Sequence, residues 1–242
     1  MSRDILIVLV GLFLAGVLRG FTGFGLALAA VPLLALALPP HQVIPVIVTA
    51  QLIAGLFDLP SIWRLADWRM VGWLSLAMAI TTPLGFWALS LLAPDTARVI
   101  IGLLVLASVL ALWRGVRVPA RPSRVLSLAV GALSGLMNGL AAMNGPPAVV
   151  YFLAQHRPTP EIRASLIAYA ILTAAAALLP FALAGLANRD TTVWTLIGLP
   201  ALFAGQAIGN FGFRRTGAAT HRTVALVSLS ALAILLILRA VL

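Results

Sequence analysis

The sequence contains no cysteine and no lysine among its 242 residues, and it carries little charge of any kind. Without cysteine, disulfides, thiolate catalysis and iron–sulfur ligation by cysteine are excluded. Without lysine, a Walker-type phosphate-binding loop is excluded. The three histidines are scattered, and no catalytic Ser/His set or zinc-binding spacing is visible. We therefore expect no enzyme, no cofactor and no metal site.

What is present is mostly apolar. Hydrophobic residues make up 62% of the chain, charged residues 9%, and the mean hydropathy is +1.10, whereas soluble domains carry about 25% charge. The excess runs along the whole length, so the sequence predicts an all-α, polytopic integral membrane protein. The net charge of +10 comes from arginines in the gaps between apolar runs. This distribution is typical of the positive-inside rule, so we expect contact with membrane lipid and none with nucleic acid.

The chain divides into about ten apolar segments, most of which reach the roughly 20 residues that cross a bilayer. The second and seventh are interrupted by glycine or proline and are short as regular helices, so they are either full spans or half-membrane helices. We interpret the first as a retained span rather than a cleaved signal peptide. The ten segments are 4–18, 20–38, 42–63, 68–92, 97–113, 124–140, 142–155, 162–187, 191–213 and 221–241.

The arginines predict the topology. With ten segments, twelve arginines fall on one side of the membrane and four on the other, whereas fusing the short segments into eight spans gives nine against six. The ten-segment division follows the positive-inside rule better. It places both termini outside and the polar linker 114–124 in the cytoplasm.

The linker separates two halves that resemble each other, 1–113 and 125–242. Pro83-Leu84-Gly85 matches Ala207-Ile208-Gly209 at an offset of 124, and Arg19-Gly20 matches Asn138-Gly139 at an offset of 119. Five segments in each half force the second half to be inverted relative to the first. Inverted repeats with paired interrupted segments are typical of secondary transporters. We expect one membrane domain built from two five-helix repeats with broken helices.

The interruptions themselves predict an anion site. Gly20, Gly23 and Gly25 disfavour a regular helix, and Pro146-Pro147 removes two amide donors. Because lipid cannot satisfy freed backbone groups, such breaks face protein or a wet cavity, and a helix that restarts there presents its positive end. The alternative for the glycines is close packing of helices through small residues.

Polar residues near the breaks complete the candidate site. Arg19 adds a permanent charge suited to a carboxylate or sulfonate, unless it snorkels to the cytoplasmic face. Asn138 and Asn144 either line a cavity or join helices by hydrogen bonds. The candidate substrate-binding set is Arg19, Gly20, Thr22, Gly23, Gly25, Gln51, Asn138, Asn144, Gly145, Pro146, Arg163 and Gln206.

Several of these residues also have plain structural explanations. Arg163 fits an interfacial anchor, and polar packing explains Gln51 and Gln206 as well as path lining does. Asp58 is the only acid well inside a segment, where it either relays protons or, as we favour, forms an interfacial salt bridge with Arg64. His41 follows Pro39-Pro40 in a predicted external turn and is a weaker candidate for a pH-sensitive gate.

The chain resembles the TauE/SafE (TSUP) family of sulfite and organosulfonate exporters. The matching pieces span most of the chain: Arg19 to Gly25 with Val31-Pro32-Leu33, Pro83-Leu84-Gly85, Asp95 to Arg98, Gly135, Gly139, Gly145-Pro146-Pro147 with Tyr151-Phe152-Leu153, Arg163-Ala164, and Gly205 to Gly209. The resemblance implies a bacterial inner-membrane permease that moves sulfite, sulfoacetate or related organosulfonates and carboxylates, typically outward. The sequence leaves open whether the chain forms a homodimer. The competing interpretations are a channel and a non-transporting assembly factor or complex subunit.

Overall fold

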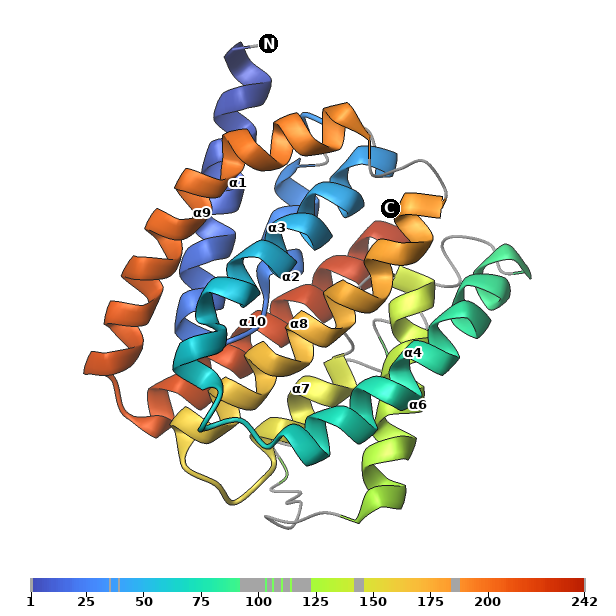
Figure 1. Ribbon diagram of the computed structural model, residues 1–242, viewed down its shortest axis with the longest axis vertical. Coiled ribbons are helices and arrows are strands. Elements are labelled where there is room, and N and C mark those ends of the chain that lie inside the picture. Colours follow the sequence, from blue (N-terminus) through green and yellow to red (C-terminus); the bar gives the residue numbers. More distant parts are fainter. Residues whose placement is uncertain are drawn as a thin grey trace. The chain divides into compact units, whose positions relative to one another are not determined.

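The computed structural model describes residues 2–34, 36–38, 40–91, 103, 106, 110, 114, 123–141, 146–183 and 188–241. Nine helices lie in these residues, labelled as in Figure 1: α1 (Ser2–Thr22), α2 (Leu26–Leu34), α3 (Pro40–Ile62), α4 (Trp68–Leu91), α6 (Arg124–Ala141), α7 (Pro146–Leu153), α8 (Thr159–Leu183), α9 (Arg189–Arg215) and α10 (Ala218–Val241).

The helices confirm the predicted class of a multi-pass, all-helical membrane protein. Four stretches in the described residues are long and apolar enough to cross a bilayer: Arg3–Thr22, Gln42–Ile62, Thr159–Leu178 and Arg189–Arg215. Many large apolar side chains are exposed, among them Leu6, Phe57 and Ile80. Such side chains suit helices that face lipid.

The contacts divide the chain into two compact units. The first unit comprises Met1–Arg64 and Ala170–His221, and the second comprises Leu65–Tyr169 and Arg222–Leu242. In the first unit α1 packs mainly against α9, and in the second α4 packs mainly against α6. Figure 1 shows each of these pairs side by side.

Glycine allows both helix pairs to pack closely. In the first unit, a Cβ atom on Gly16 would collide with the carbonyl oxygen of Leu202, and one on Gly20 would collide with that of Gln206. In the second unit, a Cβ atom on Gly135 would collide with the carbonyl oxygen of Met78. The absence of a side chain lets the backbones touch, as is common for helices in membranes.

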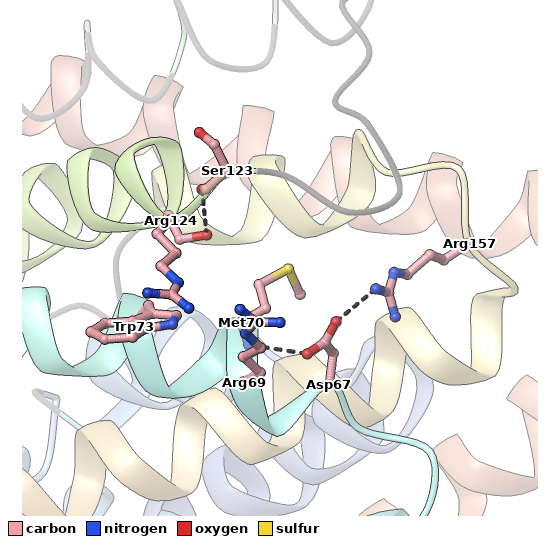
Figure 2. Close-up of a pocket in the computed structure, with 8 residues that line it drawn as sticks. Asp67, Arg69, Met70, Trp73, Ser123, Arg124 and Arg157 are labelled. Carbon is pink, nitrogen blue, oxygen red and sulfur yellow. Dashed lines mark hydrogen bonds and ion pairs between the residues drawn. The ribbon is translucent and has the colours of Figure 1, made fainter.

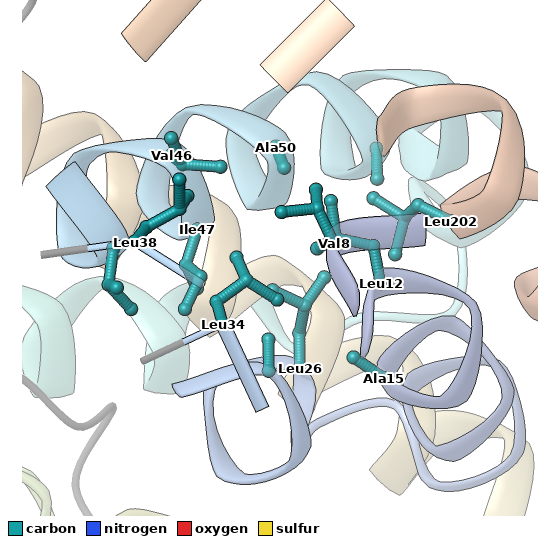
Figure 3. Packing of buried hydrophobic residues seen from close by; sticks show 13 residues of the cluster. Val8, Leu12, Ala15, Leu26, Leu34, Leu38, Val46, Ile47, Ala50 and Leu202 are labelled. Atoms are coloured by element: carbon teal, nitrogen blue, oxygen red, sulfur yellow. The ribbon is translucent and has the colours of Figure 1, made fainter. Parts of the chain in front are cut away.

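An apolar core holds the first unit together. Figure 3 shows its buried residues, which come from α1, α2, α3 and α9 and, for Leu38, from the turn between α2 and α3. Val8, Leu12, Leu34, Val46 and Leu202 are all fully buried. The core fixes the short helix α2 against the long helices α1 and α3.

The predicted boundary between the first two segments was wrong. The sequence placed it at Arg19, but α1 continues through Arg19 and Gly20 and ends at Thr22. Close packing of Gly20 on α9 outweighs the low helix propensity of glycine there. The break instead falls at residues 23–25, before α2.

Both interrupted segments contain short helices, as predicted. α2 has 9 residues and α7 has 8. α7 begins at Pro146, a position where proline costs no helical hydrogen bond. Most of the predicted segment 97–113 and of the linker 114–124 lies outside the described residues.

Candidate functional site

The break after α1 is a tight, internally bonded turn. Gly23 and Gly25 have φ angles of 85° and 90°, which only glycine adopts readily. The amide of Gly23 donates to the carbonyl oxygen of Arg19 at 2.7 Å. The hydroxyl oxygen of Thr22 lies 2.8 Å from the Leu18 carbonyl oxygen and 2.7 Å from that of Phe24. Thr22 and two of the three glycines therefore shape the break, while Gly20 serves helix packing.

Arg19 lies one turn before this break and is almost completely buried, with 1% of its surface exposed. One of its terminal nitrogens, Nη1, donates to Asp58 Oδ2 at 2.8 Å and to Gln206 Oε1 at 2.5 Å. Gln206 Nε2 in turn donates to Asp58 Oδ1 at 2.7 Å. We call Arg19, Asp58 and Gln206 the arginine triad. It joins α1, α3 and α9 in a closed ring of hydrogen bonds.

The triad balances the charge of Arg19 but leaves one of its hydrogen-bond donors without an acceptor. A charged side chain within a bilayer costs at least ~2.5 kcal/mol, and the carboxylate of Asp58 offsets this cost with an opposite charge. The other terminal nitrogen of Arg19, Nη2, is buried and has no hydrogen-bond partner. A buried guanidinium with an unused N–H group is a donor for an oxyanion.

The triad overturns two of the sequence-based alternatives. Arg19 does not snorkel to a membrane face, because its side chain is enclosed by the protein. Asp58 does not pair with Arg64 as favoured above, because its carboxylate bonds Arg19 and Gln206. The partners of Arg19 are 39 and 187 residues away in the chain, so local spacing could not identify them.

The other candidates in the first unit have structural roles or undescribed side chains. Gln51 is buried and its amide donates to the carbonyl oxygen of Ala170 at 3.1 Å, which is polar packing. His41 lies in the first turn of α3 rather than in a turn before a helix, and its side chain lies outside the described residues.

The candidates in the second unit are less well defined. Asn138 on α6 is half-buried, and its amide nitrogen lies 4.0 Å from the sulfur of Met78. Arg163 is half-buried in α8. Asn144 and Gly145 lie outside the described residues, and Pro146 is described only as the first residue of α7.

His221 is a buried polar residue that the sequence did not single out as part of the site. Its ring nitrogen Nε2 lies 3.2 Å from the carbonyl oxygen of Thr22, and its ring stacks on Phe21 with 6.2 Å between centroids. It binds the last residue of α1 and so holds the end of that helix. A histidine near the start of a distant helix carries no sequence signal for this contact.

No group of three or more His, Cys, Asp or Glu side chains that could hold a metal ion occurs in the described part of the chain. What the site offers is therefore cationic and amide chemistry: one guanidinium, one carboxylate and one carboxamide, all from helices. Of these three groups, the guanidinium is the one that can donate hydrogen bonds to an anion.

Comparison with known proteins identifies the family. No match was found in a search of curated proteins or in a search of solved structures. A family model described as "Sulfite exporter TauE/SafE" matches residues 7–236, nearly the whole chain, and the match includes every residue of the triad. The chain therefore belongs to the sulfite exporter TauE/SafE family of membrane transporters.

Proposed function

We propose that this protein is a secondary transporter that exports small anions such as sulfite, sulfoacetate or related organosulfonates and carboxylates, with Arg19 as the charge that binds them. The family supports anion transport. The observation that carries the proposed site is the buried guanidinium of Arg19, whose Nη2 has no hydrogen-bond partner. Arg19 belongs to the last turn of α1, directly before the break at residues 23–25.

In this proposal Asp58 keeps the empty site neutral. Without substrate, its carboxylate balances Arg19, so the empty protein can change conformation without moving a net charge through the bilayer. A monovalent anion that binds Arg19 leaves the site with one negative charge. A proton taken up by Asp58 restores neutrality, so Asp58 is the proposed coupling group and Arg19 the charged group that faces it.

Gln206 positions the two charged groups. Its carboxamide accepts from Arg19 and donates to Asp58, so its orientation is fixed by both. Gly20 has no side chain, so α1 can approach α9 closely at Gln206, where a Cβ atom would collide with the backbone. This close approach also brings the Gln206 carboxamide beside Arg19. A fixed amide reduces the entropy lost when an anion binds.

Matching contacts in the two units support the proposed inverted repeat. At the offsets found in the sequence, Gly16 corresponds to Gly135 and Leu202 corresponds to Met78. Gly16 abuts the carbonyl oxygen of Leu202, and Gly135 abuts that of Met78. The first helix of each proposed repeat thus packs on the fourth helix of the other, as two-fold related halves would.

A second pair of contacts follows the same offsets. Leu12 corresponds to Gly131, and Leu74 corresponds to Gly198. A Cβ atom on Gly198 would collide with Leu12, and one on Gly131 would collide with the carbonyl oxygen of Leu74. Each contact has one glycine, but Gly198 lies on α9, a fourth helix, whereas Gly131 lies on α6, a first helix. Repeats bounded at 1–113 and 125–242 account for both pairs.

The remaining parts of the proposal rest on the sequence. The arginine distribution favours both termini outside and a cytoplasmic linker, and the family resemblance implies the bacterial inner membrane. Alternating access, a contribution from the second break at residues 142–147, and the roles of Asn138, Asn144 and Arg163 in binding substrate stay predictions.

Transport by reconstituted protein tests the proposal. Proteoliposomes loaded with sulfite or sulfoacetate should release the anion, and Arg19→Ala should abolish release because the anion loses its only buried cation in the triad. Arg64→Ala is the matched control, since Arg64 is exposed in the turn after α3, and it should keep wild-type efflux. Efflux that survives Arg19→Ala would refute the proposed site.

Asp58→Asn tests the coupling role separately. The substitution removes the titratable group while keeping a side chain of the same shape beside Arg19. We expect efflux to lose its dependence on an imposed pH gradient, while counterflow of labelled substrate continues. An unchanged response to the gradient would assign coupling to another group.

A further inference from the structure

A second cationic site lies within the second unit, apart from the residues of the triad. A cavity of about 400 Å³ opens between the start of α4, the start of α6 and Arg157 (Figure 2). Three of its lining side chains are arginines, Arg69, Arg124 and Arg157, and one is an acid, Asp67. Its size is in the range of small-molecule sites, roughly 300–1,000 Å³.

Both carboxylate oxygens of Asp67, the single acid that lines the cavity, already accept hydrogen bonds. Asp67 Oδ2 accepts from Arg157 Nη2 at 2.6 Å, and its Oδ1 accepts from the amide of Met70 at 3.0 Å, in the first turn of α4. Arg157 also lies 3.5 Å from Glu161. Arg69 and Arg124 make no ion pair with an acid in the described residues. The cavity therefore keeps two positive charges without a carboxylate.

Arg124 lies over an aromatic ring. Its guanidinium carbon lies 5.4 Å from the centroid of the Trp73 ring. Figure 2 shows the two side chains next to each other. Cation–π stacking uses the face of the guanidinium and leaves its edge N–H groups available. A stacked arginine is thus arranged in advance for two parallel hydrogen bonds to a tetrahedral oxyanion.

The start of α6 adds to the positive potential. The hydroxyl of Ser123 accepts from the amide of Leu126 at 3.2 Å and so caps the helix. The first turn of α6 lines the cavity through Ser123, Arg124 and Ser127. The positive end of an 18-residue helix therefore adjoins the two arginines.

From this arrangement we propose that the cavity binds a phosphate- or sulfonate-type oxyanion, held by Arg69 and Arg124, with any attached apolar group against Trp73 and Met70. Two sources offer this chemistry: a free solute and the headgroup of an anionic phospholipid. The site shares no residue with the arginine triad, whose members belong to the other unit.

Thermal unfolding of the purified full-length protein in detergent tests the proposal. Inorganic phosphate or phenyl phosphate should raise the melting temperature more than sodium chloride of equal ionic strength, because a ligand of the native state stabilises it. Arg69→Gln with Arg124→Gln should weaken the apparent affinity at least about tenfold, the loss expected for a charge-assisted hydrogen bond. Both side chains are exposed, so folding should tolerate the change.

Controls separate this site from general charge effects and from the transport site. Arg214→Gln removes an exposed arginine of the first unit and should leave the anion effect intact. Arg19→Ala should also leave it intact, so a failed transport proposal would not affect this result. If the double variant melts too early to assay, Arg69→Gln alone should still weaken binding.

Short-chain phosphatidylglycerol distinguishes the two sources. A lipid site predicts that phosphatidylglycerol stabilises the wild type more than inorganic phosphate does, and that the double variant loses this difference. A solute site predicts the reverse order. The proposal is overturned if neither exceeds chloride, or if the double variant responds to both like Arg214→Gln.

Discussion

Two helix pairs bear comparison: α1 with α9 in the first unit, and α4 with α6 in the second. Both pairs are brought together by glycine against a backbone carbonyl, with Gly16 on Leu202 and Gly135 on Met78. They differ in the polar groups placed beside these contacts. The first pair includes Arg19, which is buried and forms an ion pair with Asp58 of α3, whereas the described residues of the second pair form no ion pair.

The difference is sharpest at the position of the arginine. At the sequence offsets, Arg19 corresponds to Asn138 and Gln206 corresponds to Thr82. Asn138 lies 4.0 Å and Thr82 3.2 Å from the sulfur of Met78. Equivalent positions are thus polar in both units but charged only in the first, so the two units share their glycine-mediated helix packing but not the buried charge.

The largest effect expected from this comparison is on stability. Gly16→Ala and Gly135→Ala should each destabilise the protein by about 1–3 kcal/mol, the usual cost of forcing an extra group into a packed contact. In both cases the new Cβ atom meets a carbonyl oxygen that belongs to the partner helix. Thermal unfolding in detergent would measure the loss, and a neutral result at one position only would break the equivalence of the two pairs.

The helical class and the two short helices could be predicted from the sequence, because apolar runs and glycine or proline clusters are local features. The end of α1 could not. It depends on Gly20 touching α9, almost two hundred residues later, and a glycine count alone favours ending the helix sooner. Tertiary packing decides such boundaries.

The three residues of the triad could be singled out from the sequence, but their contact with one another could not. Arg19, Asp58 and Gln206 each stood out as polar residues in apolar segments, but nothing local joined them. The sequence favoured Arg64 for Asp58 because it is six residues away, whereas the observed partners come from α1 and α9. A single sequence carries no information on which distant helices are neighbours.

A smaller effect is expected at a contact for which one helix pair uses glycine and the other uses threonine. Gly205 abuts the carbonyl oxygen of Phe13, while the corresponding Thr81 lies with its hydroxyl oxygen 2.9 Å from that of Ala132. Thr81→Ala should cost about 0.6 kcal/mol, typical of a hydrogen bond between membrane helices. Gly205→Ala should cost more, because a methyl group has no room there. Equal losses in thermal unfolding would mean that collision with the Phe13 carbonyl oxygen does not set the cost at Gly205.

A small effect of the opposite sign serves as the reference for the others. Gly72 lies inside α4, and a Cβ atom there would meet no atom within 4 Å. Gly72→Ala should therefore stabilise the protein by up to about 1 kcal/mol, the difference in helix propensity between the two residues. The same unfolding assay measures it beside Gly135→Ala, which makes the identical chemical change within the same unit. If Gly72→Ala destabilised the protein as much as Gly135→Ala, loss of glycine flexibility rather than collision with a neighbouring backbone would explain both, and close helix packing would no longer account for the paired glycines.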